Sequence, residues 1–325
     1  MIDLHMHLNG SLPAKTIIFL AKKYNIKLPT FNEKSLTQLI SVPLDCDNLN
    51  DYLKCTKIPR MVTQSKESIK EAISLLLNDL HNQGLIYAEI RFAPQRHQDN
   101  GLSQEDVIKA AISGLQNSPI MAKLILCCMR GKDVKSANME TIRLAHKYLN
   151  KGVGGVDLAG AEALFPTQDY AEEFNYASSL GVPFTIHAGE ADGPNSIIAA
   201  LNLGAKRIGH GIRAALNEDL MQRLVKEKIT LEMCPSSNFQ TKSVLNKQEY
   251  PLRLFLDKGI KVTINTDNKT ISGTNLSGEY NFAINELGLK EEERVQLYEN
   301  AIEASFTTLE EKAILLNRLH QSLNI

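Results

Sequence analysis

Two histidines near the start of this chain have a spacing that suits a metal ion. His5 and His7 lie in IDLHMH, a segment with the pattern of a β-strand. Residues i and i+2 of a strand share a face, so both imidazoles point the same way. His187 ends the apolar segment PFTIH, and Asp267 follows KVTINT. Three imidazoles and one carboxylate suit zinc, so we predict one zinc ion per chain held by these four residues.

The complete set carries this prediction, because any one of these histidines alone would more often be structural. His210 also ends a predicted strand, and the remaining four histidines fall in helical or loop contexts. Some barrel hydrolases bridge two metals with a modified lysine after the fourth strand. That strand here ends Asp157, Leu158, Ala159, Gly160 without a lysine, which favours a single metal. Cobalt or iron would accept the same ligands.

Eight short apolar segments, separated by polar helical stretches, must bring these side chains together. Most are continuous apolar runs, as expected of parallel strands covered on both faces. The predicted strands are residues 2–7, 85–92, 121–129, 153–158, 183–187, 206–210, 229–233 and 261–266. This alternation predicts an α/β fold, a (β/α)8 TIM barrel. A doubly wound open sheet ranks second, because neither GxGxxG nor GxxxxGK[ST] follows any strand.

Capping patterns mark several helix starts between these strands. An apolar helical period follows three such patterns: Ser103 with Asp106, Asn217 by itself, and Thr308 with Glu311. We therefore expect helices to begin at these three places.

The connection after the first strand, residues 8–84, is unusually long. It predicts a helical insertion with helices near 13–25, 47–60 and 66–84 that lie over the barrel mouth. No linker, repeat or low-complexity tract interrupts the chain, so we expect one domain spanning 1–325.

Composition excludes several classes of protein. The chain has 325 residues, 43% hydrophobic and 22% charged, with a net charge of -1, as in a soluble globular protein. It has no basic run that would attract nucleic acid. No signal peptide is evident, and no apolar stretch approaches the ~20 residues of a membrane span, so we expect a cytoplasmic protein. Five cysteines without a CxxC motif predict reduced thiols.

The predicted ligands and their neighbours resemble the adenosine deaminase family. The resemblance runs in order through HMHLNGSL, VDLAGAE, TIHAGE, RIGHGIR, LEMCPSSNFQT and INTDN. It implies zinc at His5, His7, His187 and Asp267, and it makes Glu190 the proton donor. It implies that His210 orients and activates the zinc-bound water. The implied substrate contacts are His7, Asn9, Gly160 and Asn268.

The implied reaction is hydrolysis of adenosine, and of 2′-deoxyadenosine, to inosine and ammonia in purine salvage. Such a reaction needs a nucleophile at C6 of the purine and a proton at N1. Zinc lowers the pKa of bound water to about 7. Burial under a purine would keep Glu190 neutral and able to donate its proton. The expected partner is a small purine nucleoside, and the sequence leaves the oligomeric state open.

Two positions depart from the family pattern. Asn268 stands where a second aspartate is common, and its amide donates a hydrogen bond at every pH. Asn9 stands where aspartate is common, at a position implied to contact the ribose 5′-hydroxyl. An apolar wall beside the ribose is expected at Tyr52, Leu53, Cys55 and Thr56.

Rival functions remain open. The lost charge at Asn9 makes a 5′-phosphate less unfavourable, so N6-methyl-AMP is an alternative substrate. Adenine, which would undergo the same chemistry, is another. A non-catalytic purine-binding relative is a second alternative, but it would not need Glu190. A metal-dependent phosphoesterase is a third, and it would need further clustered metal ligands.

Overall fold

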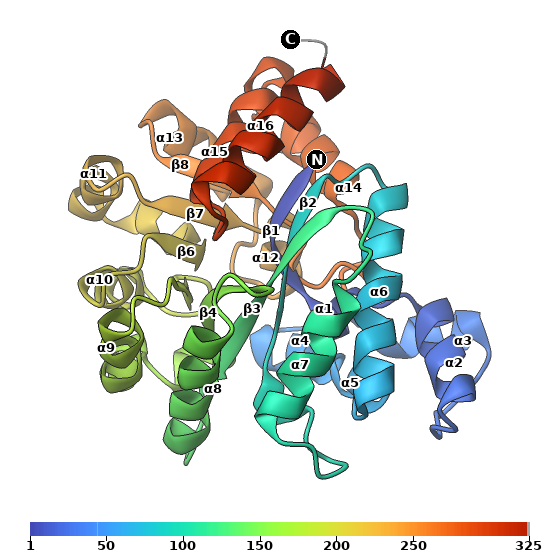
Figure 1. Ribbon diagram of the computed structural model, residues 1–325. Helices are drawn as coiled ribbons and strands as arrows, with labels where there is room; N and C mark the ends of the chain where they lie inside the picture. The colour runs from blue at the N-terminus through green and yellow to red at the C-terminus, as the bar shows by residue number, and fades with distance from the viewer. Residues whose placement is uncertain (44, 324–325) are drawn as a thin grey trace.

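Eight parallel strands form the centre of the computed structural model, which describes residues 1–43 and 45–323 (Figure 1). The strands are β1 (Ile2–His7), β2 (Tyr87–Phe92), β3 (Met121–Met129), β4 (Val153–Ala159), β5 (Thr185–Ala188), β6 (Arg207–His210), β7 (Thr230–Met233) and β8 (Lys261–Ile264). All eight predicted strands are confirmed, with small differences at their ends.

The strands close into a barrel. Adjacent strands are hydrogen-bonded in the orders β1-β2-β3-β4 and β5-β6-β7-β8, with register shifts between Asp3 and Met6 and between Leu124 and Ile125. One seam is joined by the parallel bridge between Met6 and Asp267, where the His7 amide donates to the Asp267 carbonyl at 2.8 Å. The other is joined by the bridge between Val156 and Phe184. This closure confirms the predicted (β/α)8 barrel and excludes the open sheet that ranked second.

Helices surround the strands and follow them in sequence. Those after β2 are α7 (Gln104–Gly114), α8 (Lys135–Lys147), α9 (Ala171–Ser179), α10 (Pro194–Asn202), α11 (Glu218–Lys226), α12 (Pro235–Gln240), α13 (Leu252–Asp257), α14 (Leu276–Glu286), α15 (Arg294–Ala304) and α16 (Leu309–Leu323). Short 3-10 helices are η1 (Pro94–Arg96), η2 (Glu162–Leu164), η3 (Thr167–Tyr170), η4 (Ile212–Leu216), η5 (Lys247–Glu249) and η6 (Glu291–Glu293).

The three predicted helix starts are confirmed by their caps. Ser103 and Asp106 form a reciprocal capping box at α7. The Asn217 side chain accepts the Leu220 amide at α11. At α16 the Glu311 amide donates to Oγ1 of Thr308, whose own amide donates to the Glu311 carboxylate.

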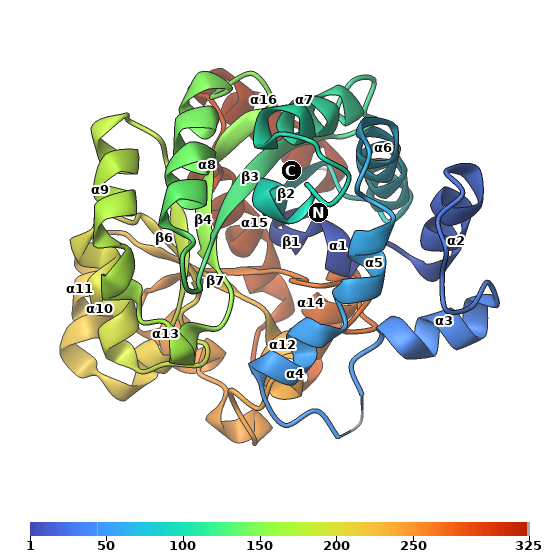
Figure 2. The same ribbon diagram turned by 90° about the horizontal axis from the view of Figure 1, so that it is seen from below.

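The insertion after β1 holds α1 (Leu8–Ser11), α2 (Ala14–Lys23), α3 (Glu33–Ile40), α4 (Leu49–Lys54), α5 (Lys57–Met61) and α6 (Lys66–Asn82). The helix predicted near 47–60 is two short helices, and α3 was not predicted. Both views show α2 and α3 at the outer side of the molecule, away from the strands (Figures 1 and 2). The expectation that the whole insertion covers the barrel mouth is therefore wrong for this pair.

The α4 segment is fixed by a small apolar cluster of its own, formed by Cys46, Leu49, Tyr52 and Ile271. The Tyr52 hydroxyl also lies 2.6 Å from Oγ of Ser272, in the loop after β8. These contacts hold α4 beside the carboxyl ends of the strands.

Two further expectations concern the whole chain. All five cysteines are free thiols, as predicted. Within the described residues, no helix is long and apolar enough to cross a membrane.

Candidate active site

The four predicted metal ligands meet at the carboxyl ends of β1, β5 and β8. Nε2 of His7 lies 3.3 Å from Nε2 of His187 and 3.3 Å from Oδ1 of Asp267. Nε2 of His5 lies 3.7 Å from the same carboxylate oxygen. Donors at zinc distances of 2.0–2.1 Å in a tetrahedral shell are separated by about 3.3 Å. His5, His7 and His187 offer nitrogens within 4.8 Å of one another, and Asp267 lies within 3.7 Å of two of them, so this cluster could hold a metal ion.

Hydrogen bonds to the opposite ring nitrogens orient these imidazoles. Nδ1 of His5 lies 2.8 Å from Glu232, and Nδ1 of His187 lies 2.9 Å from Asp157. Nε2 of His5 is buried and has no hydrogen-bond partner among the described residues. Burial lowers the pKa of His5 and of His7, so both rings are neutral and offer a lone pair. Carboxylates behind histidines commonly orient metal ligands in this way.

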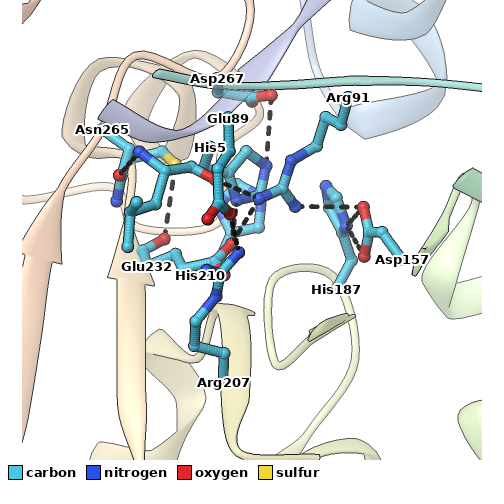
Figure 3. A network of polar contacts seen from close by, with 12 residues as sticks. His5, Glu89, Arg91, Asp157, His187, Arg207, His210, Glu232, Asn265 and Asp267 are labelled. Carbon is cyan, nitrogen blue, oxygen red and sulfur yellow. Dashed lines mark hydrogen bonds and ion pairs between the residues drawn. The ribbon is translucent and has the colours of Figure 1, made fainter. Parts of the chain in front are cut away.

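A buried ionic network supports these carboxylates from inside the barrel (Figure 3). Arg91 contacts Asp157 at 3.1 Å and Glu232 at 2.8 Å. Arg207 contacts Glu232 at 2.5 Å and Glu89 at 2.6 Å. Burial acts to raise the pKa of Glu232, but Arg207 and Arg91 outweigh burial and hold that pKa at about 2. Glu232 is therefore ionised and accepts a hydrogen bond from Nδ1 of His5.

His210 is held by a hydrogen-bonded chain from the other side of the site. The Tyr250 hydroxyl donates to Oδ1 of Asn238, and Nδ2 of Asn238 lies 3.0 Å from Nδ1 of His210. The amide thus donates to Nδ1, which leaves the proton of the neutral ring on Nε2. Burial lowers the pKa of His210, which keeps the ring neutral. Nε2 lies 3.6 Å from Oε2 of Glu190.

Glu190 is only 2% exposed and lies beside His210, whose ring centroid is 4.9 Å from that of His5. Its Oε1 has no hydrogen-bond partner within residues 1–43 and 45–323. Burial, followed by the charges of Asp267 and Glu162, raises the pKa of Glu190 well above its usual value. This shift favours the neutral carboxyl, the form that has a proton to give.

Two residues at the site have a backbone conformation that side chains normally avoid. His210 has φ +61° and Asp267 has φ +57°, both in the left-handed region. Such strain persists only where the surroundings enforce it, and it is typical of functional sites. Here it turns each side chain inward at the end of its strand.

A pocket of about 300 Å³ opens beside the cluster. The predicted site residues that line it are His7, Asn9, Gly160, His187, Glu190, His210, Asp267 and Asn268. His5 lies beneath it, fully buried. Tyr52, Leu53 and Thr56 also line the pocket, as expected. Cys55 does not; its thiol instead donates to the Ser41 carbonyl at 3.6 Å.

The two asparagines that depart from the family pattern both have partners. Nδ2 of Asn9 donates to Oγ1 of Thr63 at 3.0 Å. Nδ2 of Asn268 donates to Oδ1 of Asp267 at 2.7 Å, and Oγ of Ser237 donates to the other oxygen of Asp267 at 2.6 Å. Asn268 therefore fixes the carboxylate of Asp267, the predicted ligand, and has one N–H without a partner among the described residues.

The sequence did not predict several residues that support the candidate site. Asp157, Glu232 and Arg91 orient the ligands, and Asn238 orients His210. One feature of the sequence pointed to Asp157, Glu232 and Arg91. They are charged residues inside otherwise apolar parallel strands. Such charges must find partners inside the barrel, but the pattern does not say which ones.

The fold and the ligand cluster together define a metal-dependent barrel hydrolase. A family model described as adenosine deaminase matches residues 1–322. The adenosine deaminase of Haemophilus ducreyi is 49% identical over 99% of this chain and 96% of its own length. This chain belongs to the adenosine deaminase family.

Solved structures agree on the fold. Adenine deaminase from Arthrobacter aurescens has a TM-score of 0.86 at 25% identity, covering 100% of this chain and 99% of that one. The Arabidopsis N6-mAMP deaminase has a TM-score of 0.86 at 26% identity, covering 98% and 97%. These neighbours therefore support the barrel fold over the whole chain.

Proposed function

We propose that this protein hydrolyses adenosine, and 2′-deoxyadenosine, to inosine and ammonia with one zinc ion held by His5, His7, His187 and Asp267. The observation that carries the proposal is the position of Glu190. Its buried carboxyl, with an oxygen that has no hydrogen-bond partner among the described residues, lines the same pocket as His7, His187 and Asp267. Relatives named adenosine deaminase, such as the Haemophilus ducreyi protein, support adenosine over other purines.

Bound zinc would supply a water molecule acidic enough to act as a nucleophile near pH 7. His210 would donate its Nε2 proton in a hydrogen bond to the attacking oxygen and hold it against C6. Glu190 would give its proton to N1 as the C6–O bond forms, and the proton that the attacking water loses would return to Glu190 by the end of the cycle. The C6–N bond then breaks, ammonia leaves with a proton from the oxygen, and inosine remains. General acid catalysis of this kind contributes about 100- to 10,000-fold.

The remaining pocket residues would hold the nucleoside. The Gly160 amide would donate to N3 of the purine, since a glycine lets the backbone approach closely, and its φ of +117° suits that residue. The free N–H of Asn268 would donate to N7. Asn9 would contact the ribose 5′-hydroxyl, with His7 beside the sugar.

Release of ammonia and formation of inosine from adenosine test the proposal directly. Both should disappear after treatment with a chelator and return with stoichiometric zinc. Restoration by cobalt or iron but not by zinc would overturn the choice of metal. Purified protein that releases no ammonia when loaded with zinc would overturn the activity.

A nucleotide substrate is the second candidate, and two arginines favour it. Arg60 and Arg96 line the pocket, and neither guanidinium has a hydrogen-bond or ion-pair partner in the part of the chain that the structure describes. Turnover of adenosine, 2′-deoxyadenosine, adenine, AMP and N6-methyl-AMP under one condition separates the candidates. A higher kcat/KM for a nucleotide than for adenosine would reverse our order.

A further inference from the structure

Glu162, in η2, is a buried carboxylate surrounded by backbone donors. Its Oε1 accepts the Gly189 amide at 2.6 Å and the Ser196 hydroxyl at 2.6 Å. Its Oε2 accepts the amides of Glu190 at 3.0 Å, Ala191 at 2.7 Å and Asp192 at 3.2 Å. Four successive N–H groups thus converge on one carboxylate. Hydrogen bonds to a charged acceptor are strong, so this arrangement holds the turn firmly.

These donors belong to the turn between β5 and α10, the turn that carries Glu190. Gly189 has φ +72°, so the chain reverses there at no steric cost. The Glu190 amide bonds to Glu162, while its own carboxyl points into the pocket. The anchor therefore fixes the backbone from which the proposed proton donor projects.

A second hydrogen-bonded path joins the same anchor to a metal ligand. Arg130 donates to the His187 carbonyl at 2.7 Å and to Oγ1 of Thr167 at 2.9 Å. Thr167 lies 2.8 Å from Oγ of Ser196, which donates to Glu162. All of these groups are buried, so the path is shielded from competing water.

The position of Glu162 in the chain links two loops. It lies two residues after Gly160, in the connection after β4, yet it binds the connection after β5. We infer that Glu162 is a positioning residue that sets the separation between the Gly160 amide and the Glu190 carboxyl. These are the groups proposed to contact N3 and N1 of the purine. The inference rests on the proposed function.

A glutamine side chain at position 162 has nearly the same size as glutamate but would break this arrangement. Its side chain has one oxygen and an NH2 group. Depending on its orientation, that NH2 group would face either the Gly189 amide or the three amides that now bond Oε2. The turn would shift, and a displacement of about 1 Å at a catalytic group typically costs about 100-fold. We expect Glu162→Gln to lower kcat by about 30- to 300-fold, with zinc content unchanged.

The matched control is Glu279→Gln. Glu279 is also a buried carboxylate that accepts a backbone amide, from Ser236 at 3.1 Å, but it binds the connection after β7. This variant should keep kcat within about threefold. Glu162→Asp retains the charge with a shorter reach, so it should recover part of the loss and remain testable should Glu162→Gln fold poorly.

A double-mutant cycle separates positioning from general destabilisation. If Glu162 acts through Glu190, Glu162→Gln should cost less than about threefold in a Glu190→Gln background, because the group it positions is gone. Equal losses in both backgrounds, or near-normal kcat in Glu162→Gln, would overturn the inference. Near-normal kcat in Glu190→Gln alone would instead overturn the proposed function.

Discussion

Oδ2 of Asp157 lies 2.9 Å from Nδ1 of His187, so a carboxylate on β4 orients a metal ligand on β5. Arg91 contacts the same carboxylate at 3.1 Å from β2. Burial acts to raise the pKa of Asp157, but His187 and Arg91 lower it well below its usual value. The ionised carboxylate therefore holds the His187 ring with Nε2 toward the other ligands.

Asp157→Asn should weaken metal binding while leaving the four ligands in place. The amide is a poorer acceptor for the Nδ1 proton and loses the ion pair with Arg91. Loss of such an outer partner typically costs about 10- to 100-fold in metal affinity. Competition with a fluorescent zinc chelator measures this directly. Unchanged zinc affinity would remove Asp157 from the support of the site.

Glu190→Gln should lower kcat by about 100- to 10,000-fold without loss of zinc, since an amide binds N1 but has no proton to transfer. Metal analysis checks that zinc is retained, and steady-state kinetics measures the loss in kcat. His187→Ala is the contrasting variant and should lose metal and activity together. Ammonia release within tenfold of the parent in Glu190→Gln would exclude Glu190 as the proton donor.

The pH dependence of kcat/KM should show an alkaline limb set by Glu190. The active form is the neutral carboxyl, and burial raises its pKa well above the usual value. Activity should therefore persist far above pH 4.5 and fall as pH rises through the raised pKa. The residual activity of Glu190→Gln should lack this limb. An identical limb in both proteins would assign it to another group.

Asn268→Asp should make substrate binding depend on pH. An aspartate there donates to N7 only when protonated, whereas the amide donates at every pH. KM for adenosine should match the parent at low pH and rise as the carboxyl ionises. Parallel KM profiles for the two proteins would argue against a contact between Asn268 and N7.

Gly10→Ala should displace the same asparagine by steric contact. A Cβ at position 10 would lie 1.8 Å from Oδ1 of Asn268 and 2.5 Å from its Cβ. The side chain must move, and its bond to Asp267 would break. We expect KM to rise at least tenfold. Gly193→Ala is the matched control, because that position is open and has an ordinary φ of -79°.

Glu279→Gln should change how stability depends on pH. Burial raises the pKa of Glu279 from 4.5 to about 7. A raised folded-state pKa favours the fold below pH 4.5, and that advantage is lost as pH rises toward 7. The neutral amide avoids this loss, so the variant should gain stability relative to the parent between pH 5 and about 8. Urea unfolding at both ends of this range measures it.

Local patterns were sufficient to predict much of this protein. A spacing of two in a strand places His5 and His7 on one face whatever lies around them. Strand ends share one rim in a parallel barrel, so His187 and Asp267 were expected beside them. The capping residues at Ser103 and Asn217 act within one helical turn, and both predictions are confirmed.

Contacts between distant segments were decided only by the tertiary structure. Asp157, Glu232 and Arg91 are visible as charges in apolar strands, but their partners depend on register across the barrel. Glu162 gathers four amides from the next connection, and a backbone N–H has no signature in the sequence. The sequence by itself predicted the candidate ligands and the barrel, because both follow from local periodicity. The supports of the site arise from packing between segments that only closure of the barrel brings together.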